Sequence, residues 1–260
     1  MTIRKKSGFL RTSDLAREVG IHPNTVRLYE QWGLLPPVPR SPAGYRQFSQ
    51  AHLDQLRLIR LAFSCTVIGR NVRAIALEMV HVSAAGELGC ALELAFQFKA
   101  AVQAEHSQAE ATVQYLERWA VGTSNTMTAQ LMHIGDTAHL LDTTIDSLRG
   151  WERNGLIAVP RNPANGYREY GPEEIGRLRV IRMLIRSGYG IISILRMLSQ
   201  LDSGNNENLR QVLDTPDPDE DIQYATNRWL STLAEALAAA GDSVTLLEGM
   251  IQKVGQDSSN

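Results

Sequence analysis

Two matching sets of hydrogen-bond donors recur along the chain, and they are the residues best suited to chemistry. The first set contains Arg27 and a Gly-Tyr-Arg string at 44–46, and the second contains Arg149 and a Gly-Tyr-Arg string at 166–168. A guanidinium group stays charged at any accessible pH and binds phosphate oxygens or a guanine edge, while a tyrosine hydroxyl can donate to phosphate. The chemistry that these residues offer is the binding of a polyanion.

The two sets belong to a longer internal repeat. Three blocks of the first half return in the second half with one common offset (149 − 27 = 122) and no gap between them. The blocks are 27–35, 43–48 and 56–60 in the first copy, and 149–157, 165–170 and 178–182 in the second. A repeat of this length with fixed internal spacing indicates two copies of one folded module.

Length and composition describe an ordinary soluble chain with room for two modules. With 260 residues, 43% of them hydrophobic and 21% charged, the chain can bury a core. No apolar run approaches the roughly 18 residues of a membrane span, and the basic start of the chain continues into polar residues rather than a signal peptide. Two cysteines, Cys65 and Cys90, suit a reducing compartment. We therefore expect a cytoplasmic protein.

The net charge of −2 hides a pattern that follows the repeat. Residues 1–75 hold twelve Lys/Arg against four Asp/Glu, and residues 131–200 hold nine against seven. The segments after each copy are acidic, with two against six at 76–130 and three against eleven at 201–260. Local charge rather than the whole-chain average decides whether a face attracts a polyanion, so the two copies are the expected binding surfaces.

The first copy predicts a helix-turn-helix followed by a wing. Thr12 or Ser13 caps a short helix to Val19, and Pro23 begins a second helix that ends before Gly33. The prolines that follow predict a loop with a tight turn, which we call the wing, before a third helix with apolar residues at helical spacing. The second copy predicts the same plan.

A long amphipathic helix is predicted after each copy, because apolar residues recur there at three- and four-residue steps. The expected fold is mainly α, with two winged helix-turn-helix domains, each followed by a long coiled-coil-type helix. The expected segments are domain 1 at 9–82, a long helix at 86–121, a linker at 122–130, domain 2 at 131–203 and a C-terminal long helix at 219–254.

This order of elements resembles the DNA-binding domain of the MerR (mercury-resistance regulator) family. The strings Thr-Val-Arg-Leu-Tyr-Glu and Ser-Leu-Arg-Gly-Trp-Glu are similar to the recognition helix of that family. The resemblance covers about 70 residues in each copy. It implies a bacterial transcription regulator that binds double-stranded DNA, distorts a promoter and acts with RNA polymerase.

The residue chemistry and the resemblance point to the same DNA-binding residues. A recognition helix directs its first residues toward base edges in the major groove, and donors in a wing suit phosphates. The expected DNA-binding residues of the first copy are Thr25, Arg27, Tyr29, Arg40, Tyr45, Arg46 and Arg60. Those of the second copy are Ser147, Arg149, Trp151, Arg161, Tyr167, Arg168 and Arg182.

Some aromatic and basic residues have a structural alternative. Tyr45 and Tyr167 could serve only to pack the wings, at about equal weight with a DNA contact. Arg57 and Arg179 are expected on a solvated helix face, and Trp32 is expected in the core.

The second copy departs from the first at two acidic positions. Asp146 replaces Asn24 early in the recognition helix, and Asp142 replaces Gly20 in the turn before it. A carboxylate near phosphate opposes binding, so the second copy is expected to bind DNA more weakly. The alternative is that Asp146 only stabilises the N-terminus of its helix. In the first copy, Cys65 is expected as a buried core thiol.

MerR-type proteins are usually homodimers joined by an antiparallel coiled coil, as the resemblance implies. Here each copy is followed by its own long helix. We expect an intramolecular pseudo-dimer in which the two long helices pair and one chain presents both reading heads. A homodimer with four reading heads is the alternative.

No residues indicate an enzyme, a resident metal or a cofactor. The histidines show no ligand spacing, and Cys90 stands alone near the start of the first long helix. The residues identify no effector, and an unknown small-molecule effector is one alternative that they leave open. The second interpretation of the chain is a small-molecule-sequestering protein that binds a drug or metabolite between the long helices, with reduced DNA binding. A steep fall of DNA affinity with salt would distinguish the two functions.

Overall fold

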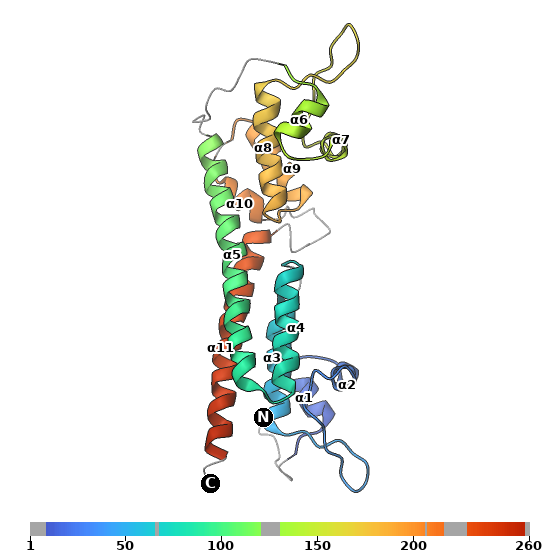
Figure 1. Ribbon diagram of the computed structural model, residues 1–260, viewed down its shortest axis with the longest axis vertical. Helices are drawn as coiled ribbons and strands as arrows, with labels where there is room; N and C mark the ends of the chain where they lie inside the picture. The colour runs from blue at the N-terminus through green and yellow to red at the C-terminus, as the bar shows by residue number, and fades with distance from the viewer. Residues whose placement is uncertain (1–8, 66–67, 121–130, 206, 216–227, 258–260) are drawn as a thin grey trace. The chain divides into compact units, whose positions relative to one another are not determined.

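The computed structural model describes residues 9–65, 68–120, 131–205, 207–215 and 228–257. The expected linker at 122–130, and most of the acidic segment before the C-terminal helix, lie outside these residues. Within them the regular elements are helices, and the only β pairing consists of isolated bridges (Figure 1). The prediction of a mainly α fold with two winged helix-turn-helix domains is therefore confirmed.

The helices fall into two equivalent series with a long helix after each. The first series is α1 (Thr12–Glu18), α2 (Pro23–Gln31), α3 (Gln50–Ser64), α4 (Arg70–Ala84) and the long α5 (Leu88–Ala120). The second series is α6 (Ile134–Leu140), α7 (Ile145–Arg153), α8 (Pro172–Arg186), α9 (Ile191–Asp202), the short α10 (Leu209–Asp214) and the long α11 (Trp229–Asp257). Helix α10 was not predicted from the sequence.

Local signals in the sequence set the start of α2 and the turn before it in the first module, which comprises α1 to α4. The predicted cap of α1 at Thr12 or Ser13 is wrong, because the helix already begins at Thr12 and its N-cap is Arg11. Pro23 occupies the first turn of α2, where its missing N–H costs nothing, and the ring of His22 accepts a hydrogen bond from Asn24 N at 3.2 Å. Gly20, at φ +67°, turns the chain between α1 and α2. Leu15 and Val26 are fully buried and hold the two helices together.

A buried amide connects α3 to its neighbours in the same module. Gln55, which is fully buried, donates to the carbonyl oxygens of Leu34 at 2.9 Å and Val80 at 2.8 Å. It also accepts from Ser83 Oγ at 2.7 Å. Each polar atom of the amide is therefore satisfied, so α3, α4 and the segment that follows α2 keep one relative placement.

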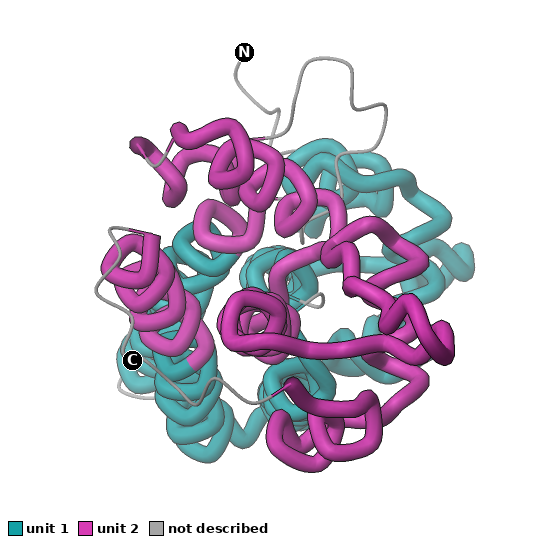
Figure 2. Tube along the Cα trace, turned by 90° about the horizontal axis from the view of Figure 1, so that it is seen from above, with its two compact units in different colours: residues 1–104, 233–260 teal, residues 105–232 magenta. Residues whose placement is uncertain are grey.

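The chain divides into two compact units, each containing one module (Figure 2). Unit 1 comprises 1–104 and 233–260, and unit 2 comprises 105–232. The long helices α5 and α11 are therefore each shared between the two units.

In unit 1, the C-terminal part of α11 packs on the first module. Lys253 Nζ lies 2.7 Å from the carboxylate of Asp54, whose side chain is only 2% exposed. Cys65 Sγ donates to the carbonyl oxygen of Ala236 at 3.6 Å. Cys65 is buried, as predicted, and burial raises the pKa of its thiol.

In unit 2, the C-terminal part of α5 packs on the second module, α6 to α10. Thr112 and Ser187 share a buried hydroxyl–hydroxyl hydrogen bond of 2.7 Å. Arg210 NH1 donates to Glu110 Oε1 at 2.7 Å, and this hydrogen bond holds the pKa of Glu110 below its usual range. Each module thus packs with the distal end of the long helix that follows the other copy.

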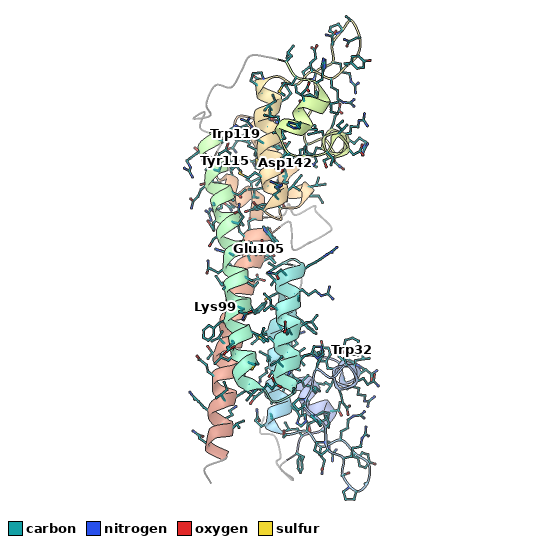
Figure 3. The ribbon with its side chains drawn as sticks, in the orientation of Figure 1. Trp32, Lys99, Glu105, Tyr115, Trp119 and Asp142 are labelled. Atoms are coloured by element: carbon teal, nitrogen blue, oxygen red, sulfur yellow. The ribbon has the colours of Figure 1, made fainter. Side chains whose placement is uncertain are left out.

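The prediction that Trp32 belongs to the core is wrong. Trp32, labelled in Figure 3, is 59% exposed. Its ring lies near that of Tyr29, with the two ring centroids 6.1 Å apart. Trp32 is the C-cap of α2, and this position faces solvent. Its counterpart Asn154 is exposed as well and donates to Gly150 O at 2.8 Å.

Helix α11 is long and apolar enough, by length and composition alone, to cross a membrane. No apolar run approaching a membrane span was expected from the sequence, so this helix differs from that expectation. Leu233, Ala240 and Leu247 on one side of α11 are fully buried in unit 1.

Candidate nucleic-acid interface

The recognition helix of the first module, α2, presents Arg27 to solvent. Arg27 NH1 donates to Asn24 Oδ1 at 3.0 Å, one turn earlier on the same face. Thr25 is half-buried between them. Val26 anchors the opposite side of the helix in the core. The helix therefore holds a guanidinium and a side-chain amide together on one exposed face.

The recognition helix of the second module, α7, repeats this pair with a different charge. Arg149 NH1 lies 3.6 Å from Asp146 Oδ1, where the first module has the neutral amide. The Asp146 side chain is 91% exposed, so its charge faces solvent. Ser147 is half-buried, and its backbone N–H donates to Thr144 Oγ1 at 3.0 Å, which caps the helix. The acidic substitution changes the field around Arg149 and leaves the capped helix in place.

The tyrosines of the two wings are open to solvent. Tyr45 is 76% exposed and Tyr167 is 66% exposed, so neither ring packs into a module. Each wing closes by a guanidinium that donates to a glycine carbonyl at 3.4 Å, from Arg40 to Gly44 in the first and from Arg161 to Gly166 in the second. This arrangement favours a ligand contact for the tyrosines over a packing role.

A glutamate in each recognition helix forms ion pairs with the wing arginines, an interaction that was not predicted from the sequence. Glu30 Oε2 accepts from Arg46 Nε at 2.5 Å, and Glu152 Oε2 accepts from Arg168 Nε at 2.7 Å. The same carboxylates lie 4.0 Å from Arg40 NH2 and 3.6 Å from Arg161 NH2. Identity of Glu30 and Glu152 at equivalent repeat positions was the available signal.

These ion pairs give the wing arginines two functions. Arg46 and Arg168 are only 26% and 25% exposed in their side chains, while Arg40 and Arg161 are 54% and 53% exposed. The first two fix the wing against its recognition helix through Nε. The other two keep much of the guanidinium open to an anion.

The two aromatic residues expected to contact DNA from the recognition helices differ in burial. Tyr29 is half-buried, and its ring meets Phe63 edge-on at 5.8 Å. Burial raises the pKa of its hydroxyl, and the charge of Arg60 opposes that shift. Trp151 belongs to the core of the second module with 9% of its surface exposed, which does not favour the expected contact through its indole N–H.

Arg60 and Arg182 occupy equivalent positions in α3 and α8 but have different surroundings. Arg60 is exposed and forms no ion pair within the part of the chain that the structure describes. The side chain of Arg182 is 25% exposed and pairs with Asp142 at 2.9 Å. Arg57 pairs with Asp54 at 3.2 Å, which agrees with its expected place on the helix surface.

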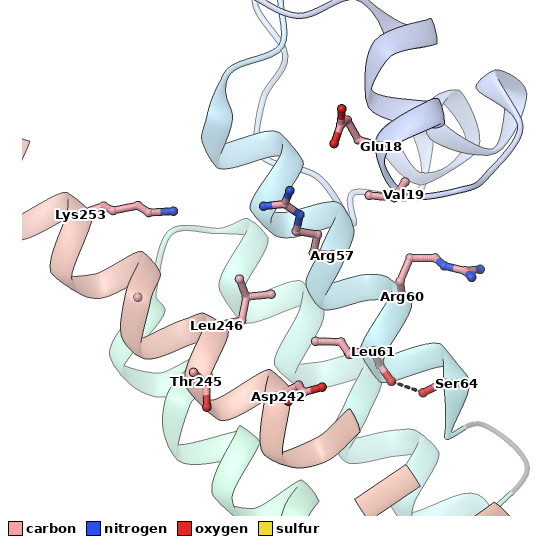
Figure 4. Close-up of a pocket in the computed structure, with 11 residues that line it drawn as sticks. Glu18, Val19, Arg57, Arg60, Leu61, Ser64, Asp242, Thr245, Leu246 and Lys253 are labelled. Carbon is pink, nitrogen blue, oxygen red and sulfur yellow. Dashed lines mark hydrogen bonds between the residues drawn. The ribbon is translucent and has the colours of Figure 1, made fainter. Parts of the chain in front are cut away.

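An open cavity of about 700 Å³ lies in unit 1 between the first module and α11 (Figure 4). Leu61 and Leu246 supply apolar surface from its two sides. Arg57, Arg60 and Lys253 bring positive charge to it, and its other lining residues include Glu18 and Asp242.

No group of three or more His, Cys, Asp or Glu side chains that could hold a metal ion occurs among the described residues. Both cysteines are free there, Cys65 buried and Cys90 exposed.

Comparison with known proteins identifies the module type. The model of the MerR HTH family of regulatory proteins matches the chain twice, at 10–64 and at 132–201. These matches cover α1 to α3 in the first module and α6 to α9 in the second.

Similar curated proteins are bacterial regulators that match over a short stretch. The chain is 42% identical over 53 residues to the HTH-type transcriptional regulator CueR of Salmonella typhi, which is 20% of this chain and 38% of that protein. It is 40% identical over 50 residues to the mercuric resistance operon regulatory protein of Bacillus cereus, or 19% of this chain and 38% of that protein. No solved structure matches the chain significantly.

Proposed function

We propose that this chain, whose two helix-turn-helix modules belong to the MerR family, is a sequence-specific transcriptional regulator that binds duplex promoter DNA with both modules. The observation that carries the proposal is the repeated surface formed by each recognition helix and its wing. Each surface combines an exposed recognition-helix arginine with an exposed wing tyrosine and a glutamate brace between helix and wing.

The two parts of each surface would bind different parts of DNA. The first turn of α2 or α7 enters the major groove, where Arg27 and Arg149 face base edges. The wing lies along the backbone, where Tyr45 and Tyr167 donate to phosphates. The glutamate braces fix the angle between helix and wing. Engagement of both modules then offsets the energy of distorting the promoter.

The exchange of helix ends supports an intramolecular pseudo-dimer. The first module packs with the distal end of α11 through Asp54 and Lys253, and the second packs with the distal end of α5 through Ser187 and Thr112. A single chain then supplies both long helices and both heads, and no second copy is needed to complete either unit. The cytoplasm is the compartment for such a protein, and RNA polymerase at the promoter is its expected partner.

Selection of bound duplexes from a random library, followed by affinity measurements from 50 to 200 mM salt, tests this function. A selected duplex should bind far more tightly than unrelated duplex, with affinity that falls steeply as salt rises. Double substitution of Arg27→Ala and Arg149→Ala should remove the preference for the selected sequence. Absence of any enriched sequence would contradict the proposal.

The cavity in unit 1 favours small-molecule sequestration as a second candidate function. Its volume of about 700 Å³ is in the range of drug-sized ligand sites, although it lies between the first module and α11 rather than between the two long helices. Tight binding of an apolar compound, with no salt-dependent binding of any duplex, would favour this candidate. Leu246→Arg should then abolish binding of the compound.

A further inference from the structure

The turn of the helix-turn-helix differs between the modules in a way that costs backbone energy. Gly20 in the first module has φ +67°, which glycine adopts freely. Asp142 at the equivalent position has φ +43°, and the only other non-glycine residue with positive φ in the described parts of the chain is Asn208. Asp and Asn are the non-glycine residues that adopt this region most readily, at a higher cost than glycine.

The carboxylate of Asp142 holds two arginines of α8. Its Oδ2 lies 2.9 Å from Arg182 NH2 and 3.1 Å from Arg186 NH2 (Asp142 is labelled in Figure 3). Arg182 and Arg186 are one helical turn apart, so a single carboxylate reaches both.

The first module keeps only one member of this cluster, Arg60, the counterpart of Arg182. Gly20 replaces Asp142, Ser64 replaces Arg186, and Ser64 Oγ donates instead to Leu61 O at 2.7 Å. Arg60, the counterpart of Arg182, extends from α3 without an ion pair within the described residues (Figure 4). At this equivalent position, the guanidinium of the second module is paired with a carboxylate and that of the first module is not.

We propose that Asp142 acts as an internal substitute for a DNA phosphate, holding Arg182 and Arg186 and thereby setting the affinity of the second module below that of the first. The inference rests on the proposed DNA-binding function. A carboxylate and a phosphate use the same guanidinium donors, so a backbone phosphate competes with Asp142 for Arg182 NH2 and is repelled by its charge. Asp142 is thus an affinity-determining residue that acts through the two arginines.

The exposure of the cluster makes it adjustable. The side chains of Asp142 and Arg186 are 81% and 63% exposed, whereas that of Arg182 is 25% exposed, so the carboxylate and one of its two partners face solvent. Ion pairs in such positions are weak and are screened by salt, so DNA can displace the carboxylate. The cluster lowers affinity without abolishing binding, and it does so most strongly at low salt.

Two matched substitutions in the full-length chain test the inference. Asp142→Asn removes the charge and keeps a residue that tolerates positive φ. Glu173→Gln removes one exposed carboxylate from the same module and leaves the cluster intact. Binding to a duplex selected by the wild-type protein is measured by fluorescence anisotropy from 50 to 200 mM salt.

Asp142→Asn should tighten binding more than Glu173→Gln at low salt and steepen the salt dependence. One additional phosphate contact adds about 0.9 to the slope, which amounts to about 3.5-fold over that salt range, and release of both arginines about doubles the slope change. Adding Arg182→Ala to Asp142→Asn should reverse about half of the gain, and adding Arg186→Ala as well should reverse the rest. Gly20→Asp combined with Ser64→Arg should build the cluster in the first module and weaken binding.

The outcomes separate this inference from the proposed function. If wild-type protein selects no duplex, the DNA-binding function fails and the inference fails with it. If wild-type protein binds its duplex but Asp142→Asn and Glu173→Gln behave alike at every salt concentration, the phosphate-substitute role is overturned. A lower melting temperature for Asp142→Asn with unchanged affinity also overturns it, because Asp142 would then only reduce repulsion between Arg182 and Arg186.

Discussion

At the scale of single residues, the arginines of the two recognition helices have partners of different charge. Arg27 donates to an amide at 3.0 Å, whereas Arg149 lies 3.6 Å from a carboxylate. A neutral acceptor leaves the positive potential around a guanidinium unchanged, whereas an exposed carboxylate beside it lowers that potential and so weakens the attraction for DNA. The same side chain is therefore expected to contribute unequally in the two modules.

Arg27→Ala should weaken binding to the selected duplex by about 1–3 kcal/mol, because a guanidinium contact to a base edge is lost. Arg149→Ala should cost less, since Asp146 already opposes its contact. Anisotropy titrations at physiological salt measure both changes. Equal affinity of wild type and Arg27→Ala would show that α2 does not read bases through this side chain.

Asp146→Asn gives the second module the residue of the first. It should tighten binding at low salt, because it removes an exposed carboxylate from a surface that faces phosphates, and the gain should shrink as the Debye length falls below about 8 Å. The control is circular dichroism, which should show an intact helix. Unchanged or weaker binding at low salt would instead favour a role for Asp146 at the helix N-terminus.

At the scale of elements, a close contact joins the second module to the start of α11. A Cβ atom added at Gly188 would lie 2.5 Å from Trp229 Cε2, and Gly188 also has φ +91°. Trp229 is 4% exposed, so its indole cannot move into solvent without losing its packing. The connection between α8 and α9 therefore requires glycine for two separate reasons.

Gly188→Ala should lower the free energy of unfolding of unit 2 by about 2–4 kcal/mol, combining the cost of positive φ with overpacking against Trp229. Gly204→Ala is the matched control, because Gly204 has φ +78° and nothing within 4 Å of an added Cβ. Chemical denaturation of both variants measures the difference. Equal decreases in the free energy of unfolding for the two variants would mean that Trp229 moves aside without an energetic penalty.

The elements that the sequence predicted are those with local signals. Proline at the start of α2 and glycines in the turns marked the helix-turn-helix, and the fixed offset carried the assignment to the second copy. Helix α10 lacked such a signal, since its buried residues Leu209 and Leu213 stand in a polar segment. The ion pair between Asp142 and Arg182, 40 positions apart, depends on tertiary structure, so no local sequence pattern predicted it.

At the scale of the whole molecule, the repeat determines what assembly is needed. Within unit 1 the distal end of α11 packs on the first module, and within unit 2 the distal end of α5 packs on the second, which is the packing that the proposed pseudo-dimer requires. The sequence predicted two long helices but not which module each distal end would contact. The apolar stripe of a helix shows which side is buried, without identifying the element that covers it.

Covalent connection of two diverged modules has consequences for the operator and the oligomeric state. A homodimer of identical chains reads a palindrome, because operator symmetry mirrors protein symmetry. One chain with Asn24 in one recognition helix and Asp146 in the other can instead read two unequal half-sites. Tethering also makes binding of the second head intramolecular, with an effective concentration in the millimolar range for short flexible connections.

We therefore expect one chain per operator and a monomer in solution. Light scattering should give a mass near 28.8 kDa for the free protein over the concentrations used for DNA binding, and the mass of one chain plus duplex for the complex. The half-sites recovered by selection should differ in sequence, and swapping them should leave affinity unchanged only if the protein can reverse its orientation. A mass of two chains at low concentration together with a palindromic operator would overturn the pseudo-dimer, because the exposed surfaces of α5 and α11 would then be joining separate chains.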